Sequence, residues 1–167
     1  MSKNPKNFDL SEILDLNKIE AVNKPIEKAH GLPNECYTSE KYLMIERERV
    51  FQDKWIAIGI GSSVPNPGDA LPYNLLGIPL ILLRDKESKI RVFHNVCSHR
   101  GYKLLDKPCS LKNLLRCPYH SWSYDLEGKL VATPHIGGLN IHESEKFEKS
   151  KSNLKEVRSK IWMDIIF

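Results

Sequence analysis

Two short cysteine–histidine pairs constrain this chain more than any other feature of its sequence. Cys97 and His99 lie one residue apart in NVCSHRG, and Cys117 and His120 lie two residues apart in RCPYHSW. A lone cysteine is most often a small buried apolar residue, but thiolate and imidazole together are typical metal ligands. The two pairs therefore predict a metal centre.

The mixed order of the ligands favours one kind of centre. Structural zinc sites commonly take two neighbouring cysteines and two neighbouring histidines, whereas each pair here holds one cysteine and one histidine. Two loops that meet at their tips could place both cysteines on one iron and both histidines on a second iron. That is the ligand set of a Rieske 2Fe–2S centre. A mononuclear zinc site is the weaker alternative.

Composition excludes several other classes of protein. The chain has 167 residues and a net charge of +4, with basic residues scattered among almost as many acidic ones, so no nucleic-acid partner is predicted. No apolar run approaches the ~18 residues that a membrane span needs, and the N-terminus lacks the apolar stretch of a signal peptide. A cytoplasmic protein without a membrane partner is expected. Cys36 and Cys109 have no histidine at ligand spacing and are interpreted as non-ligands.

The first third of the chain is predicted to contain one or two helices on an extended arm. Residues 1–37 form a polar arm, in which a few apolar residues at helical spacing predict a short helix capped by Asp9 or Ser11. Residues 38–54 are predicted to form a helix that leads into the main domain, with Thr38 as its N-cap. The fold is thus expected to open with an arm of one or two helices.

The rest of the sequence has an antiparallel β pattern. Short apolar segments separated by turn signals occupy residues 55–140: WIAIGIG, DALPYNLL, PLILLRD, IRVFHNV, SWSYD and KLVAT. The three residues LEG at 126–128 predict a hairpin loop. Residues 141–167 are interpreted as a charged linker followed by an apolar strand, the start of a further, truncated catalytic domain.

Residues 31–134 closely resemble the N-terminal Rieske domain of the large (alpha) subunits of Rieske-type non-haem iron ring-hydroxylating oxygenases. The matching stretches are GLPNECYTSEKYLMIERERVFQDKW, VPNPGD, FHNVCSHRG, CPYHSWSYDLEGKL and the following Pro134. The resemblance implies a mainly β Rieske iron–sulfur fold. This is an antiparallel β-sandwich with a small cluster-binding subdomain, whose ligand loops are residues 97–101 and 117–122.

The resemblance also implies a role for each ligand. Cys97 and Cys117 would bind one iron, and His99 and His120 the other. Four flanking residues match the family's two boxes or its hydrogen bond to the cluster: Arg100, Gly101, Trp122 and Tyr124. For Tyr124, simple packing in a hairpin is an equal alternative.

Four positions differ from the residues that related proteins carry there. Ser121 stands where the family usually has glycine, which would cost about 1 kcal/mol if the backbone there is left-handed. Tyr102 and Tyr119 stand where respiratory-chain Rieske proteins carry an extra pair of disulfide-forming cysteines. Trp122 replaces the serine that donates a hydrogen bond to the cluster in those proteins. Fewer hydrogen bonds to the sulfurs predict a low-potential, oxygenase-type centre.

In the resembled family, electrons from NAD(P)H reach the cluster through a reductase, sometimes by way of a ferredoxin. They pass to a mononuclear non-haem Fe(II) held by two histidines and a carboxylate in a C-terminal domain, usually in a neighbouring subunit of a trimer or hetero-oligomer. After His120 only His135 and His142 remain, so the chain is not expected to hold that catalytic iron. Whether the chain alone is an enzyme stays open.

The resemblance thus predicts an oxidoreductase component, the electron-transfer domain of a mono- or dioxygenase that hydroxylates or demethylates a small organic substrate. Its two imidazole ligands are expected to couple electron and proton uptake. The alternatives are a stand-alone, ferredoxin-like Rieske electron carrier and, more weakly, a zinc-stabilised binding module.

Overall fold

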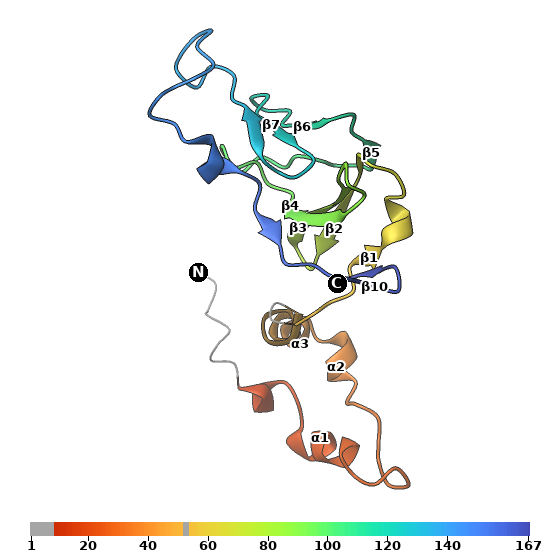
Figure 1. Ribbon diagram of the computed structural model, residues 1–167. Coiled ribbons are helices and arrows are strands. Elements are labelled where there is room, and N and C mark those ends of the chain that lie inside the picture. The colour runs from red at the N-terminus through yellow and green to blue at the C-terminus, as the bar shows by residue number, and fades with distance from the viewer. Residues whose placement is uncertain (1–8, 52–53) are drawn as a thin grey trace. The chain divides into compact units, whose positions relative to one another are not determined.

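The computed structural model describes residues 9–51 and 54–167 (Figure 1). The chain divides into two compact units, Met1–Ile56 and Ala57–Phe167. The described helical segments of the first unit are η2 (Leu10–Glu12), α1 (Leu16–Val22), α2 (Glu35–Thr38), α3 (Glu40–Glu46) and the π-helical turn η3 (Arg47–Phe51). None of the helices in these described residues is long and apolar enough to cross a membrane.

Side-chain caps mark where η2, α1 and α3 begin. Asp9 accepts a hydrogen bond from the Ser11 backbone N–H at 2.9 Å, which confirms Asp9 as the cap of the first turn. The prediction of Thr38 as a cap is wrong, because Thr38 ends α2 and the Ser39 hydroxyl accepts from the Tyr42 N–H instead. The predicted helix at 38–54 therefore begins at Glu40, and its positions 52 and 53 lie outside the described residues.

One helix of the arm was not predicted. The Asp15 carboxylate accepts from the Asn17 N–H at 2.9 Å and starts α1. The Asp-Leu-Asn order there is a capping signal that the sequence offered.

The second unit consists of three antiparallel sheets. The first has the strand order β5 (Cys109–Ser110), β2 (Asp69–Leu75), β3 (Ile78–Arg84), β4 (Ile90–His94) and β9 (Glu156–Val157). The second is formed by β6 (Leu114–Arg116), β7 (Ser123–Asp125) and β8 (Leu130–Ala132), and the third by β1 (Gly59–Ile60), β11 (Ile165–Ile166) and β10 (Ile161–Trp162). Two 3-10 turns, η4 (Gly61–Ser63) and η5 (Lys149–Ser152), connect them.

The main sheet is covered on both faces. β3 is its central strand, and the four residues Leu80, Ile81, Leu82 and Leu83 are all buried. Because successive side chains point to opposite faces, Ile81 and Leu83 face one layer of core and Leu80 and Leu82 the other. The first layer includes residues of the β6–β7–β8 sheet and both cysteines of the metal-binding pattern. The predicted mainly β, antiparallel fold is confirmed.

The C-terminal segment is part of this unit. β9 pairs with β4, Leu154 is buried in the core, and Ile166 is 1% exposed where β11 pairs with β1. Residues 161–167 were predicted as one strand, but Met163 and Asp164 adopt left-handed backbone with φ of 47° and 64° and turn the chain into a hairpin. Residues 141–167 thus belong to the same compact unit as residues 57–140, and the boundary at residue 140 stays a prediction.

Candidate metal centre

The first ligand loop follows β4 and is closed by two backbone hydrogen bonds. The Cys97 N–H donates to the Tyr102 carbonyl at 2.8 Å, and the Gly101 N–H donates to the Cys97 carbonyl at 2.9 Å. Gly101 has a φ of 70°, so the loop turns through left-handed backbone at this residue.

The second ligand loop, between β6 and β7, repeats this geometry. The Cys117 N–H donates to the Trp122 carbonyl at 2.8 Å, and the Ser121 N–H donates to the Cys117 carbonyl at 3.0 Å. Ser121 has a φ of 60° and occupies the place that Gly101 holds in the first loop. Serine rather than glycine therefore costs about 1 kcal/mol of strain here. The two loops are structural equivalents, and each presents one cysteine and one histidine.

The two thiols lie together in the core. Cys97 and Cys117 are both 2% exposed. Burial raises the pKa of the Cys117 thiol, and the neighbouring Cys97 raises it further, while the backbone N–H groups of Tyr119 and His120 directed at its sulfur act in the opposite direction. N–H groups that point at a sulfur stabilise the thiolate form, which is the form that binds metal.

The two imidazoles lie together as well. The ring centroids of His99 and His120 are 4.9 Å apart, with 66° between the ring planes. Burial, then His120 and then Arg100 lower the pKa of His99, which favours the neutral form that ligates metals. The Nδ1 atom of His120 is buried and has no hydrogen-bond partner. An unpartnered buried nitrogen costs about 1–3 kcal/mol, and a metal bound at this atom would remove that cost.

This arrangement fits a two-iron cluster. Within residues 9–51 and 54–167, no three histidine, cysteine, aspartate or glutamate side chains gather closely enough to hold one ion. The donors form instead a pair of thiols and a pair of imidazoles, and a Rieske cluster needs one such pair for each iron. The donor set and the unpartnered nitrogen both match that group.

A comparison with known families identifies the unit. The family model described as the Rieske [2Fe-2S] domain matches residues 54–143, more than half of the chain. The chain belongs to the Rieske 2Fe–2S domain family. The predicted Rieske fold and Rieske cluster are thereby confirmed, and the zinc-stabilised module is not supported.

Several proteins similar to this Rieske domain are named as oxygenase subunits. The carnitine monooxygenase oxygenase subunit of Acinetobacter pittii is 32% identical over 83% of this chain and 36% of its own length. The biphenyl dioxygenase subunit alpha of Metapseudomonas furukawaii is 34% identical over 69% of this chain and 25% of its own length. A solved quaternary ammonium Rieske monooxygenase with γ-butyrobetaine superimposes with a TM-score of 0.71 at 30% identity, covering 83% of this chain and 38% of that one. The chain therefore spans about a third of the length of the first relatives it matches.

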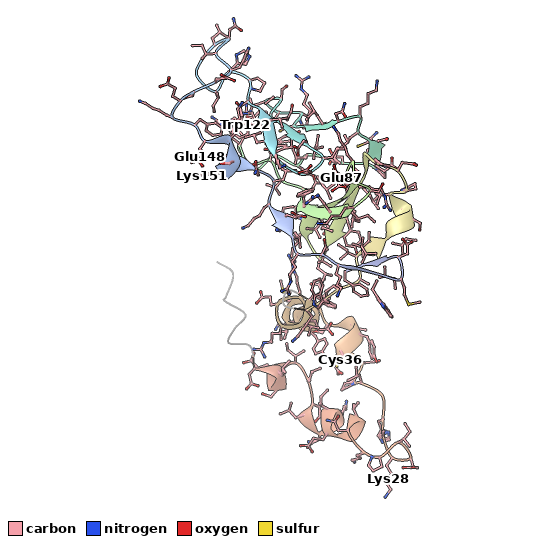
Figure 2. All side chains as sticks on the ribbon, viewed as in Figure 1. Lys28, Cys36, Glu87, Trp122, Glu148 and Lys151 are labelled. Carbon is pink, nitrogen blue, oxygen red and sulfur yellow. The ribbon has the colours of Figure 1, made fainter. Side chains whose placement is uncertain are left out.

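Aromatic side chains enclose the imidazoles of the Rieske domain. The indole of Trp122, labelled in Figure 2 beside β7, stacks on the His99 ring with centroids 4.5 Å apart and planes within 8°. The ring of Tyr119 packs against the His120 ring, with the two ring centroids 3.7 Å apart. Tyr102 and Tyr119 lie 5.4 Å apart, so an aromatic contact joins the two loops where related respiratory proteins carry a disulfide.

Tyr124 contacts a ligand cysteine directly. Its side chain is fully buried, and its hydroxyl lies 3.2 Å from the Cys97 sulfur. Burial raises the pKa of this phenol strongly, so it stays protonated and can donate. Packing alone does not account for Tyr124, because its hydroxyl also lies within hydrogen-bond distance of the Cys97 sulfur; a hydrogen bond to the cluster itself stays a prediction.

Sequence reasoning missed two residues of the site. Asn95 is 1% exposed, and its side-chain amide donates to the Leu105 carbonyl at 2.7 Å while its oxygen accepts from the Leu104 and Leu105 N–H groups. These bonds close the first ligand loop across its base. Ser98 bonds to Tyr124 through both its backbone and its side chain. The signal that could have found Asn95 is its position as a polar residue directly after an apolar strand. No feature of the sequence pointed to Ser98.

The other cysteines and histidines lie on segments other than the two ligand loops. Cys36 lies on α2 of the first unit (Figure 2), and Cys109 on β5, where burial raises its thiol pKa. His94 ends β4, and burial lowers its pKa. The ring centroids of His135 and His142 are 5.1 Å apart, and the Nδ1 atom of each ring accepts a hydrogen bond from a backbone N–H.

Proposed function

We propose that Cys97 and Cys117 hold one iron of the Rieske cluster and that His99 and His120 hold the other. The observation that carries this assignment is the pairing of thiol with thiol and imidazole with imidazole on two equivalent loops. The unpartnered Nδ1 of His120 supports it, because that atom is the one that would face the iron. Its Nε2 then carries the ring proton on the outer side.

When bound, the cluster supplies one-electron transfer. The surrounding residues hold its ligands and limit access of water. Cys97 and Cys117 are held in the apolar core, Trp122 covers the face of the His99 ring, and Tyr124 donates toward the Cys97 sulfur. The outer nitrogen of each imidazole is the atom at which proton uptake would follow electron uptake, at a pH where the oxidised form has lost the proton from that atom. A low potential of the oxygenase type stays a prediction.

We further propose that the chain is the electron-transfer domain of an oxygenase subunit. The whole protein would use NAD(P)H-derived electrons and dioxygen to hydroxylate or demethylate a small organic substrate. The support is that the relatives are named as oxygenase subunits and that this chain spans only about a third of them. The catalytic mononuclear Fe(II), a reductase or ferredoxin as donor, a homotrimer or hetero-oligomer and a cytoplasmic location all belong to this proposal.

The substrate class favoured by the relatives is a small quaternary ammonium compound. The names of three relatives specify carnitine, choline and glycine betaine as what they act on. Aromatic substrates are the second candidate, since a biphenyl dioxygenase also matches. Turnover assays with the full-length subunit and both substrate classes would decide between them.

Cysteine variants test the ligand assignment. We expect the anaerobically purified chain to hold two irons and two sulfides, and Cys97→Ser and Cys117→Ser to lose most of both. Cys36→Ser and Cys109→Ser are matched controls that should keep them, because these cysteines lie on α2 and β5 and not on the ligand loops. Equal iron content in all four variants would contradict the assignment.

The gene tests the oxygenase role. An open frame that continues beyond the Phe167 codon and encodes two histidines and a carboxylate at facial-triad spacing is the expected result. A stop codon directly after Phe167 would favour the stand-alone electron carrier instead.

A further inference from the structure

The hydroxyl of Tyr124 has one proton and two acceptors within reach. The Cys97 sulfur lies 3.2 Å from it, and the Ser98 Oγ lies 3.0 Å from it on the other side. A cluster-bound thiolate carries no proton and can only accept. The tyrosine therefore donates either to the sulfur or to the serine, but not fully to both.

The contacts of Ser98 decide its role toward Tyr124. Its hydroxyl donates to the Ser152 carbonyl at 2.6 Å, a contact formed between the first ligand loop and η5. Since that bond uses the only proton on Oγ, the oxygen is left to act as an acceptor toward Tyr124. The Ser98 backbone N–H donates to the tyrosine oxygen at 3.1 Å and holds the phenol in place independently of the serine side chain.

We propose that Ser98 competes with the Cys97 sulfur for the proton of Tyr124 and thereby lowers the reduction potential of the cluster. The inference rests on the ligand assignment of the proposed function. A hydrogen bond to a ligand sulfur stabilises the reduced, more negative cluster and raises its potential. An acceptor that draws the proton away has the opposite effect. Ser98 is thus a positioning residue, which acts on the cluster only through Tyr124.

Redox titration of two variants tests the direction. Ser98→Ala removes the competing acceptor but keeps the backbone N–H that holds the phenol, so the potential should rise. At fixed ambient potential the ratio of reduced to oxidised cluster should increase by roughly two- to tenfold, the range of one hydrogen bond. For one electron that corresponds to about 20 to 60 mV. Tyr124→Phe removes the hydrogen-bond donor to the Cys97 sulfur, so the ratio of reduced to oxidised cluster should decrease.

The double variant separates competition from a loosened loop. In the Tyr124→Phe background, Ser98→Ala should leave the potential unchanged, because no proton remains to compete for. Ser152→Ala is the matched control: it keeps the carbonyl that Ser98 bonds and should titrate like the unmodified chain.

Three outcomes would overturn the inference. Ser98→Ala could leave the potential unchanged or lower it, or it could shift the potential equally with and without the phenol. In each case the visible spectrum of the bound cluster would persist, so only the role of Ser98 would fail. A chain that holds no cluster at all would overturn the ligand assignment and this inference with it.

Discussion

Two different residues, Gly101 and Ser121, give the two ligand loops the same left-handed backbone turn. Gly101 and Ser121 both adopt left-handed backbone, at φ of 70° and 60°. Glycine adopts this region freely, whereas serine is strained in it. In return, the Ser121 hydroxyl accepts from the Arg116 guanidinium at 2.8 Å, but this contact is exposed and water can replace it. The strain at Ser121 is therefore largely uncompensated.

Reciprocal substitutions at the two positions should change stability in opposite directions. Ser121→Gly should raise the melting temperature of the cluster-loaded protein by about 3 °C, as expected for relief of about 1 kcal/mol. Gly101→Ala should lower it by a similar amount through backbone strain alone, because an added Cβ would meet no atom within 4 Å. Circular dichroism melts of matched samples measure both. A melting temperature that does not rise in Ser121→Gly would show that the strain is compensated.

At the scale of elements, the first ligand loop depends on one side chain at its base. Asn95 binds the backbone of Leu104 and Leu105 with three hydrogen bonds of 2.7 to 3.0 Å, and it is almost fully buried. No strand pairing holds this stretch of the loop, so the amide replaces the backbone bonds that a sheet would provide.

Asn95→Ala should open the loop. The substitution leaves buried backbone groups without partners, which should destabilise the unit by about 2–4 kcal/mol. We expect the bound cluster to bleach markedly faster in air, followed by visible absorbance. Asn113→Ala, at an exposed position in the next loop, is the matched control and should bleach at the unmodified rate. Equal bleaching rates in the two variants would contradict the role given to Asn95.

Elements differed in how well the sequence predicted them, for physical reasons. β2, β3 and β4 were predicted because each is a long apolar run bounded by turn residues. β5, β6 and β9 were not, since two or three residues carry no pattern and these strands exist only through their partners. The arm helix α1 was missed although its cap was visible, and the cap of α3 was placed one residue early.

At the scale of the whole molecule, the meeting of the two cysteine–histidine pairs could be predicted from the sequence, and the contacts that support them could not. The four donors and Trp122 stand within two short motifs, so spacing and residue type were sufficient to find them. The bridge from Cys97 through Tyr124 and Ser98 to Ser152 joins segments far apart in the chain, which no local pattern reveals. The same holds for the C-terminal residues, which complete two of the sheets of the second unit.

The central claim is that two histidines and two cysteines share one cluster. Pulsed electron paramagnetic resonance of the reduced chain, with its histidines labelled with nitrogen-15, tests this most directly. We predict couplings from two histidine nitrogens, of which one disappears in His99→Ala and the other in His120→Ala if a cluster is retained. A paramagnetic cluster without histidine coupling, or a colourless protein that holds zinc, would contradict the account.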